Sequence, residues 1–305
     1  MGKYVVKRLG IALITIWLVA TLTFFLMNLV PGGPFLSEKA VSPKALAALE
    51  EKYGLDKPLS EQYVTYIKGA VQFDFGDSLK QRGRTVASII TSKFPVSARI
   101  GGLAVLIAFC IGVPLGCVSA LHRGKVVDNV IIVLATCGIA VPSFVICTLL
   151  MYFFGMRLGW LPTLGLGTWK HFIMPITALA FYPTAYITRL MRSSMLDVLG
   201  QDYMRTARAK GLNQFVRLFK HALRNAILPV VTYMGPLLAY TVTGSFIVEK
   251  IFNIPGLGRE FISSITNRDY TVIMGTTIFL ATLMVLMNVV VDIVYKLVDP
   301  RIKLK

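Results

Sequence analysis

Charged side chains are scarce in this sequence. Only 15% of its 305 residues are Asp, Glu, Lys or Arg, whereas soluble domains carry about 25%. The deficit falls in six charge-free runs: Leu9–Ser37, Ile100–His122, Asn129–Met156, His171–Thr188, Asn225–Val248 and Tyr270–Val291. About 20 apolar residues suffice for a helix to cross the hydrocarbon core of a membrane. The pattern predicts an all-α membrane protein with about six transmembrane helices, of which His171–Thr188 is the weakest because it is short and contains two prolines.

Cysteine is also scarce, and its placement excludes two kinds of site. The sequence has four cysteines, Cys110, Cys117, Cys137 and Cys147, and all lie inside predicted spans. None sits in a loop where a disulfide framework or a zinc site would form. We therefore interpret them as small packing residues, and we expect no metal site.

Catalytic patterns are missing as well. An intramembrane aspartyl enzyme needs two carboxylates within its spans, and a metal-dependent one needs a helix of the His-Glu-x-x-His kind. Asp292 is the one acid near a span, and we expect Lys296, four residues on, to be its structural partner. No G-x-x-x-x-G-K-[ST] phosphate-binding loop is present. We expect no catalytic residue and no cofactor in this chain.

The net charge of +17 could suggest nucleic acid as a partner, but the placement of the charges indicates a membrane orientation instead. With six spans the two termini share a side. That side has only five acidic residues but 17 of the 32 basic ones. The basic residues are Lys3, Lys7 and Arg8, then Arg123 and Lys125, then eight between Arg189 and Arg224, then Lys296, Arg301, Lys303 and Lys305. By the positive-inside rule, both termini and the 189–224 loop are cytoplasmic.

This orientation divides the chain into four parts. Residues 1–30 form the first span; a signal peptide is the alternative, but the apolar stretch is too long and no small-x-small cleavage site follows it. Residues 31–97 form an external segment, in which we expect helices from Lys44 to Tyr53 and from Ser60 to Val71, and an interfacial helix at Arg84–Lys93. Residues 98–298 form a five-helix core with a cytoplasmic loop at 191–224, and residues 299–305 form a cytoplasmic tail.

The cytoplasmic loop carries a short basic segment between two glycines. Gly200 and Gly211 enclose Gln201–Lys210, which is rich in helix formers, and Asn213 follows as a candidate cap for a second, amphipathic helix. A basic amphipathic helix on anionic lipid is one interpretation. The other is a docking element for a cytoplasmic partner, presented between two spans.

The same loop resembles the peptide/nickel branch of the permeases of ABC importers. The resemblance rests on Asp202–Leu212 and His221–Thr232, with Arg205-Thr206-Ala207 preceding Gly211 at the spacing of the Glu-Ala-Ala pattern of the wider superfamily. Further segments agree in order along the chain: Tyr53–Leu59, Phe73–Ser78, Gly159–Pro162, Ile254–Gly258 and Asp299–Arg301. Within this branch the chain is most similar to B-type subunits of oligopeptide importers from Gram-positive bacteria; dipeptide and nickel-chelate importers are the alternatives.

The resemblance implies a type I permease fold and several partners. These are a second homologous permease, one or two ATP-binding subunits that hold ATP and Mg²⁺, and an extracellular peptide-binding lipoprotein, all at the cell membrane. It also implies that the loop is the coupling element that contacts the ATPase, through Gln201, Asp202, Tyr203, Met204, Arg205, Thr206, Ala207, Arg208, Lys210 and Gly211. Within this set we expect Tyr203 and Met204 to be buried in the partner's cleft, and the basic residues to pair with its acids.

Polar residues inside the spans are few, and they provide candidates for a peptide path. We select Tyr233, Thr241, Ser245, Thr276 and Asn288, although hydrogen bonds that only pack helices are the common role of such residues. The fifth span is rich in Pro and Gly, so we expect it to line the path and the Phe246–Phe252 region to lie near the external gate. A secondary peptide transporter is the rival interpretation, but internal repeats and buried acids are not evident.

Overall fold

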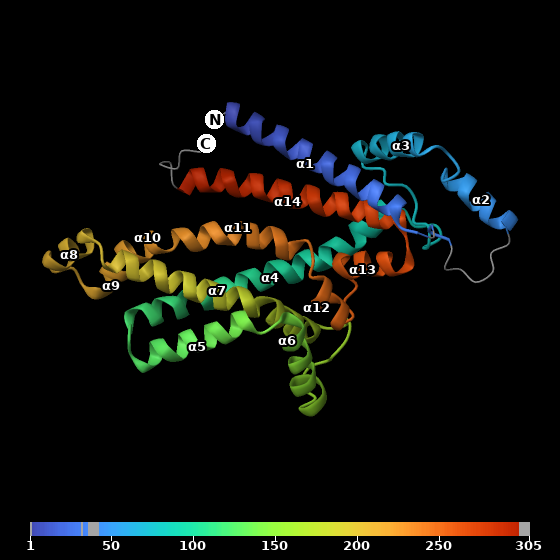
Figure 1. The fold of residues 1–305 in the computed structure, drawn as a ribbon. Coiled ribbons are helices and arrows are strands. Elements are labelled where there is room, and N and C mark those ends of the chain that lie inside the picture. Colours follow the sequence, from blue (N-terminus) through green and yellow to red (C-terminus); the bar gives the residue numbers. More distant parts are fainter. Residues whose placement is uncertain (1, 32, 36–42, 299–305) are drawn as a thin grey trace.

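The computed structural model describes residues 2–31, 33–35 and 43–298, and this part of the chain is helical apart from its connections (Figure 1). The predicted tail at 299–305 and the side chains of Asp292 and Lys296 lie outside the described residues. The α-helices are α1 Gly2–Leu29, α2 Pro43–Tyr53, α3 Leu59–Val71, α4 Val86–Leu121, α5 Val126–Ala140, α6 Ser143–Leu150, α7 Ile173–Leu199, α8 Asp202–Ala209, α9 Gln214–Val216, α10 Arg224–Ala226, α11 Leu228–Val242, α12 Phe246–Ile251, α13 Leu257–Asn267 and α14 Tyr270–Val298. Two π-helical segments, Met151–Arg157 and Arg217–Leu223, and a 3₁₀ turn, Trp169–Phe172, complete the described elements.

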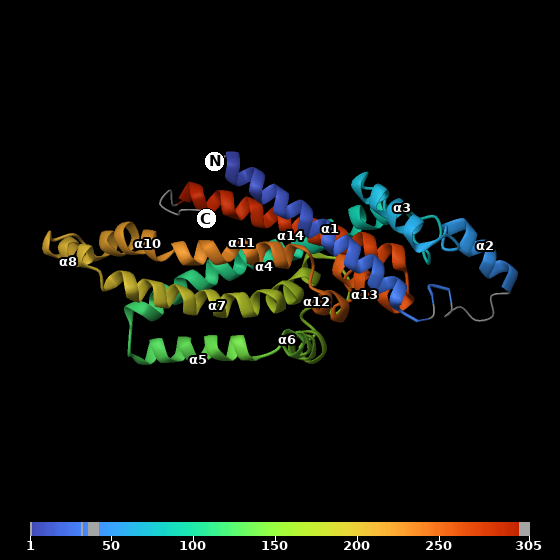
Figure 2. The same ribbon diagram turned by 45° about the horizontal axis from the view of Figure 1, so that its top comes forward.

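The long helices run roughly side by side (Figures 1 and 2). Within the described residues, four helices are long and apolar enough to cross a membrane: Val6–Leu29, Val86–Leu121, Leu228–Ile251 and Tyr270–Val290. The start of α1, the end of α14 and the short helix α8 lie toward one end of the molecule, and α2, α3, α12 and α13 lie toward the other. This arrangement agrees with the predicted grouping of both ends of the chain and the basic loop on one side.

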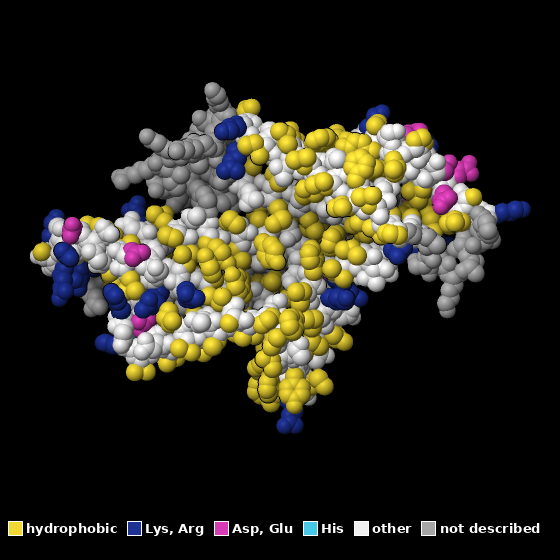
Figure 3. All heavy atoms as spheres, in the orientation of Figure 1, with side chains coloured by type: hydrophobic (Ala, Val, Ile, Leu, Met, Phe, Trp, Pro, Cys, Tyr) yellow, Lys and Arg dark blue, Asp and Glu magenta, His cyan; other side chains and the backbone are white. Residues whose placement is uncertain are grey.

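The third predicted span is not one straight helix. Its two halves, Val126–Ala140 and Ser143–Arg157, are bent by 103°, because Pro142 has no N–H to continue the helix and disfavours helical backbone at the preceding residue. Val141 is accordingly extended, with φ −81° and ψ 123°. The second half leaves the bundle sideways, and apolar side chains cover it (Figure 3). The two helices therefore form either one broken span or a re-entrant loop.

The fourth predicted span, α7, is the central helix of the bundle. It packs against α4, α5, α6 and α11, and its buried residues recur along its whole length from Met174 to Met195. Neighbouring helices shield it, so it tolerates Pro183 and several polar residues that a lipid-facing helix would not. This position explains why its sequence is the least apolar of the six.

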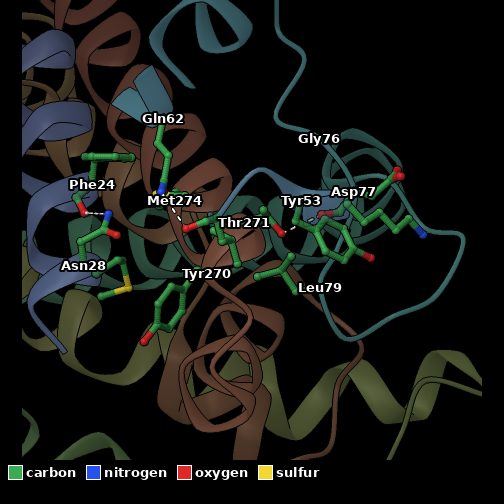
Figure 4. A pocket seen from close by; sticks show the side chains of 13 residues that line it. Phe24, Asn28, Tyr53, Gln62, Gly76, Asp77, Leu79, Tyr270, Thr271 and Met274 are labelled. Carbon is green, nitrogen blue, oxygen red and sulfur yellow. Dashed lines mark hydrogen bonds between the residues drawn. The ribbon is translucent and has the colours of Figure 1, made fainter. Parts of the chain in front are cut away.

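The external segment folds onto the outer ends of α1 and α14. Helices α2 and α3 match the predicted ones, but the expected interfacial helix at Arg84–Lys93 is only the first part of α4, which begins after the Thr85 cap and runs unbroken for 36 residues. Asp269 fastens the segment to the start of α14, because its buried carboxylate accepts hydrogen bonds from the Ser78 hydroxyl and the Leu79 N–H. A cavity of about 330 Å³ remains between these parts, lined by residues such as Phe24, Tyr53 and Tyr270 (Figure 4).

Candidate coupling site and path

The basic segment of the cytoplasmic loop is a separate short helix, α8, at the tip of the molecule (Figure 1). Extended backbone at Gln201 precedes it, and Gly211, with φ +72°, ends it. Such a left-handed residue after the last helical turn is the usual position for glycine. Gly200 has φ −78°, which any residue adopts, so only Gly211 is required by its backbone. The predicted glycine-bounded helix is therefore present, with one conformationally special end.

The inner face of α8 is buried within this chain. Met204 and Ala207 are each only 7% exposed, and Met204 belongs to the same apolar cluster as Ala222 and Ala226 of the following helical segment. Tyr203 is half-exposed, and its hydroxyl accepts a hydrogen bond from the Asn225 amide at 2.8 Å. Met204 and Ala207 therefore attach α8 to its own chain, and the expected contact of Met204 with a partner's cleft stays a prediction.

The outer face of α8 is polar and mainly basic. The exposed members of the predicted coupling set are Gln201, Asp202, Tyr203, Arg205, Thr206, Arg208, Lys210 and Gly211. Arg205 lies 3.5 Å from Asp202, but both side chains are largely in solvent, so the pair contributes little to stability. Lys and Arg side chains gather at this end of the molecule (Figure 3). The geometry leaves a cationic helix face free to meet an acidic surface.

The helical segment after α8 presents aromatic side chains beside this face. Asn213 accepts a hydrogen bond from the Phe215 N–H at 3.1 Å, as expected of a cap. Phe215 and Phe219 lie one turn apart with ring centroids 4.3 Å from each other, and both are more than half exposed. This end of the molecule therefore combines basic and aromatic groups.

The five predicted path residues separate into two groups. Thr241 and Thr276 are buried, at 3% and 0% exposure, and their hydroxyls donate to carbonyls of their own helices. Both therefore have a packing role in this structure, and their place on a path stays a prediction. Ser245 caps α12 by accepting from the Val248 N–H at 3.3 Å, and Asn288 is exposed on α14.

Tyr233 is the path candidate with aromatic neighbours. Its ring centroid lies 4.3 Å from that of Tyr186, and Tyr186 lies 6.3 Å from Tyr182. Tyr182 is 45% exposed, and Tyr186 and Tyr233 are partly buried, so the rings on α7 and α11 form a row that reaches the surface. Tyr182 and Tyr186 are not among the path residues predicted from the sequence, although their spacing of four residues indicates that they share a helix face.

A buried carboxylate fastens the external loop after α12. Glu249 is 2% exposed, and it accepts hydrogen bonds from the Ser97 hydroxyl at 2.7 Å and the Arg259 N–H at 2.9 Å. The Ser97 oxygen in turn accepts from the Leu257 N–H at 2.8 Å. A Cβ on Gly256 would lie 2.3 Å from the Glu249 carboxylate, so glycine is required there. These contacts hold the loop against α4, and the gate expected near Phe246–Phe252 stays a prediction.

Comparison with protein families identifies this architecture. Residues 112–304 match the family described as binding-protein-dependent transport system inner membrane component, and residues 1–101 match its N-terminal companion. The chain belongs to this family. The dipeptide transport system permease protein of Bacillus subtilis is 46% identical over 100% of this chain and 99% of its own length. The oligopeptide transport system permease protein of Haemophilus influenzae is 41% identical over 99% of this chain and its full length.

Solved structures support the same fold for this family member. The MetNI methionine ABC transporter in an inward-facing conformation aligns with a TM-score of 0.57, covering 69% of this chain and 96% of that one, at 17% identity. At this identity the likeness concerns the fold alone. The expected ABC importer permease fold is therefore confirmed, with four apolar spans or five including the bent pair.

Proposed function

We propose that this chain is the membrane-spanning permease subunit of an ATP-driven peptide importer and that it couples to a cytoplasmic ATPase through α8. The observation that carries the proposal is the helix itself: a basic outer face, an inner face anchored by Met204, and a place between α7 and α11. A helix that only bound lipid would turn its apolar groups outward, whereas Met204 and Ala207 of α8 face inward. The exposed rings of Phe215 and Phe219 belong to the next helical segment, not to α8. ATP hydrolysis belongs to the partner, which holds ATP and Mg²⁺.

The transport path in this proposal runs between this chain and a second, homologous permease. Tyr233, Ser245 and Asn288 are its candidate lining residues, joined by Tyr186 and Tyr182 through their contact with Tyr233. Tyrosine rings offer apolar surface with a polar tip, which suits peptides of varied side chains. An extracellular peptide-binding lipoprotein would deliver the substrate to the outer end, and alternating access would release it inside.

We infer that the substrate is an oligopeptide, with dipeptides and nickel chelates as the alternatives. Similar relatives carry both dipeptide and oligopeptide names; those named for oligopeptides support this choice, and those named for dipeptides support the first alternative. Uptake of labelled peptides of two to six residues by membrane vesicles would distinguish them. The organisms of these relatives include Bacillus subtilis, Haemophilus influenzae and Salmonella typhimurium, and a Gram-positive source for this chain remains a prediction.

Purification of this chain with its genomic neighbours tests the assembly. In mild detergent we expect a second permease of similar size, one or two ATP-binding subunits and a peptide-binding lipoprotein to be recovered, as identified by mass spectrometry. Recovery of the chain alone, although its partners are expressed, would contradict the proposal. A secondary transporter or a lipid-bound loop would then be the better interpretation.

Charge reversal on α8 tests the docking face. Arg205→Glu together with Arg208→Glu should reduce the recovered ATPase at least about tenfold, because like charges placed across an interface cost several kcal/mol. Both side chains are exposed, so the fold of the chain should be unaffected. Lys68→Glu, an exposed lysine on the external helix α3, is the matched control and should change nothing. Equal recovery for both variants would exclude an electrostatic contact through α8.

A further inference from the structure

A buried ion pair joins the cytoplasmic half of α7 to the start of α5. The Arg192 guanidinium donates two hydrogen bonds to Asp128, one from Nε to Oδ1 and one from Nη2 to Oδ2, each 2.7 Å long. Asp128 is 2% exposed, and the Arg192 side chain is 25% exposed. Two parallel bonds to a planar group fix orientation as well as distance, which a lysine could not do.

Two further donors tie the same carboxylate to α4. The Ser119 hydroxyl, in the last turn of α4, donates to Oδ1 of Asp128 at 2.5 Å. The Gly124 N–H, in the turn between α4 and α5, donates to Oδ2 at 2.9 Å. Asp128 is thus shared by α4, its following turn and α7. Since a buried carboxylate that loses its cation is strongly destabilised, these parts stay joined when one of them moves.

Glycines remove the free space between the same helices. A Cβ on Gly116 of α4 would lie 2.6 Å from the Met191 Cβ of α7. A Cβ on Gly138 of α5 would lie 2.7 Å from the Ala185 Cβ of α7. Contacts this close leave no room for sliding. Helices α4, α5 and α7 are therefore packed as one block, with the ion pair at its cytoplasmic end.

The block is connected directly to α8. Helix α7 is continuous from Ile173 to Leu199, and Arg192 lies about two turns before its end. Only Gly200 and Gln201 separate α7 from α8. A displacement of α8 therefore reaches Arg192 through a rigid helix, and it reaches α4 and α5 through Asp128.

We propose that Asp128 and Arg192 form a transmission clamp that makes α4, α5 and α7 follow α8 as one rigid body. The proposal rests on the proposed function, because it needs an ATPase subunit that moves α8. In it, both residues are positioning residues that act through α7. The clamp converts motion of α8 into motion of three helices, one of which, α7, carries Tyr182 and Tyr186.

Two variants of the clamp separate transmission from folding. Asp128→Asn removes the charge and keeps the shape, and Arg192→Lys keeps the charge and removes the paired geometry. In the full complex we expect each to retain ATP hydrolysis while peptide uptake falls about tenfold. Lys57→Gln breaks an ion pair of similar length, 2.8 Å, which is exposed on the external side, and this control should change neither activity. Hydrolysis and uptake that fall together, in proportion to the recovered complex, would overturn the clamp.

A distance measurement in the same complex gives a readout that is independent of activity. Spin labels at Val126→Cys and Ser193→Cys, two exposed positions beside the clamp, would be introduced after the four native cysteines are replaced. We expect one narrow distance, unchanged by ATP, with the native pair, and a broadened distribution that shifts with ATP in Asp128→Asn. A distribution that stays narrow in the variant would overturn the clamp. Failure of any ATPase to join the complex would instead contradict the proposed function.

Discussion

Replacement of Gly211 by proline should separate ATP hydrolysis from peptide uptake. Gly211 has φ +72°, whereas proline is held near −65°. Its N–H donates to the Arg208 carbonyl at 3.0 Å, and proline has no N–H. Lys210, just before it, has a helix-like backbone with ψ 5°, which a following proline disfavours. Three separate conflicts therefore arise at the end of α8.

We expect a large loss of peptide uptake, because the three backbone conflicts of proline at position 211 act together. A proline misfit of this kind costs about 3 kcal/mol, so we expect peptide uptake to fall at least about tenfold, measured in vesicles at matched amounts of complex. Gly211→Asn is the control, because asparagine adopts left-handed backbone more readily than other residues, and it should retain most of the uptake. Normal uptake by Gly211→Pro at normal expression would exclude a coupling role for this end of α8.

Replacement of Gly101 by alanine should impair the packing of α4 against α11. A Cβ on Gly101 would lie 2.2 Å from the Thr241 carbonyl oxygen and 2.5 Å from its carbon. Both atoms belong to the backbone, so no side-chain rotation can relieve the contact, and the helices must separate. Overpacking of this kind costs roughly 1–3 kcal/mol, and we expect the upper part of that range.

The neighbouring residue supplies a matched control for this prediction. A Cβ on Gly102 would meet no described atom within 4 Å, and alanine is favoured over glycine inside a helix by about 1 kcal/mol. Gly102→Ala should therefore be neutral or slightly stabilising. The amount of monodisperse protein left after heating, measured by size-exclusion chromatography, compares the two variants. Equal thermal stability would show that α4 and α11 can move apart without cost.

Local sequence signals predicted local structure well. The external helix α2 begins at Pro43 and ends before Gly54, and Gly211 ends α8 with the left-handed backbone for which glycine is favoured. The charge distribution predicted which ends of the chain lie together. These features depend on residues that are close in sequence, so composition and spacing were enough to find them.

Contacts between distant residues could not be predicted from the sequence. Nothing near Met204 indicates that it faces Ala222 rather than a partner, since α8 is exposed on every other side. Thr241 and Thr276 were selected because polar groups are rare in spans, but their burial depends on the helices packed around them. Asp128 and Arg192 are 64 positions apart, and each appeared only as a charge near the cytoplasmic end.

The sequence by itself determined the class of protein, its orientation, its short external and cytoplasmic helices and its family resemblance, because hydrophobic length and charge act on each segment separately. Tertiary structure alone decided which helix is central, where the third span bends, which face of α8 is free and which charges meet. Helix α7 illustrates the difference: its prolines and polar residues weaken it as a lipid-facing span, and only the surrounding helices make it suitable for the centre of the bundle.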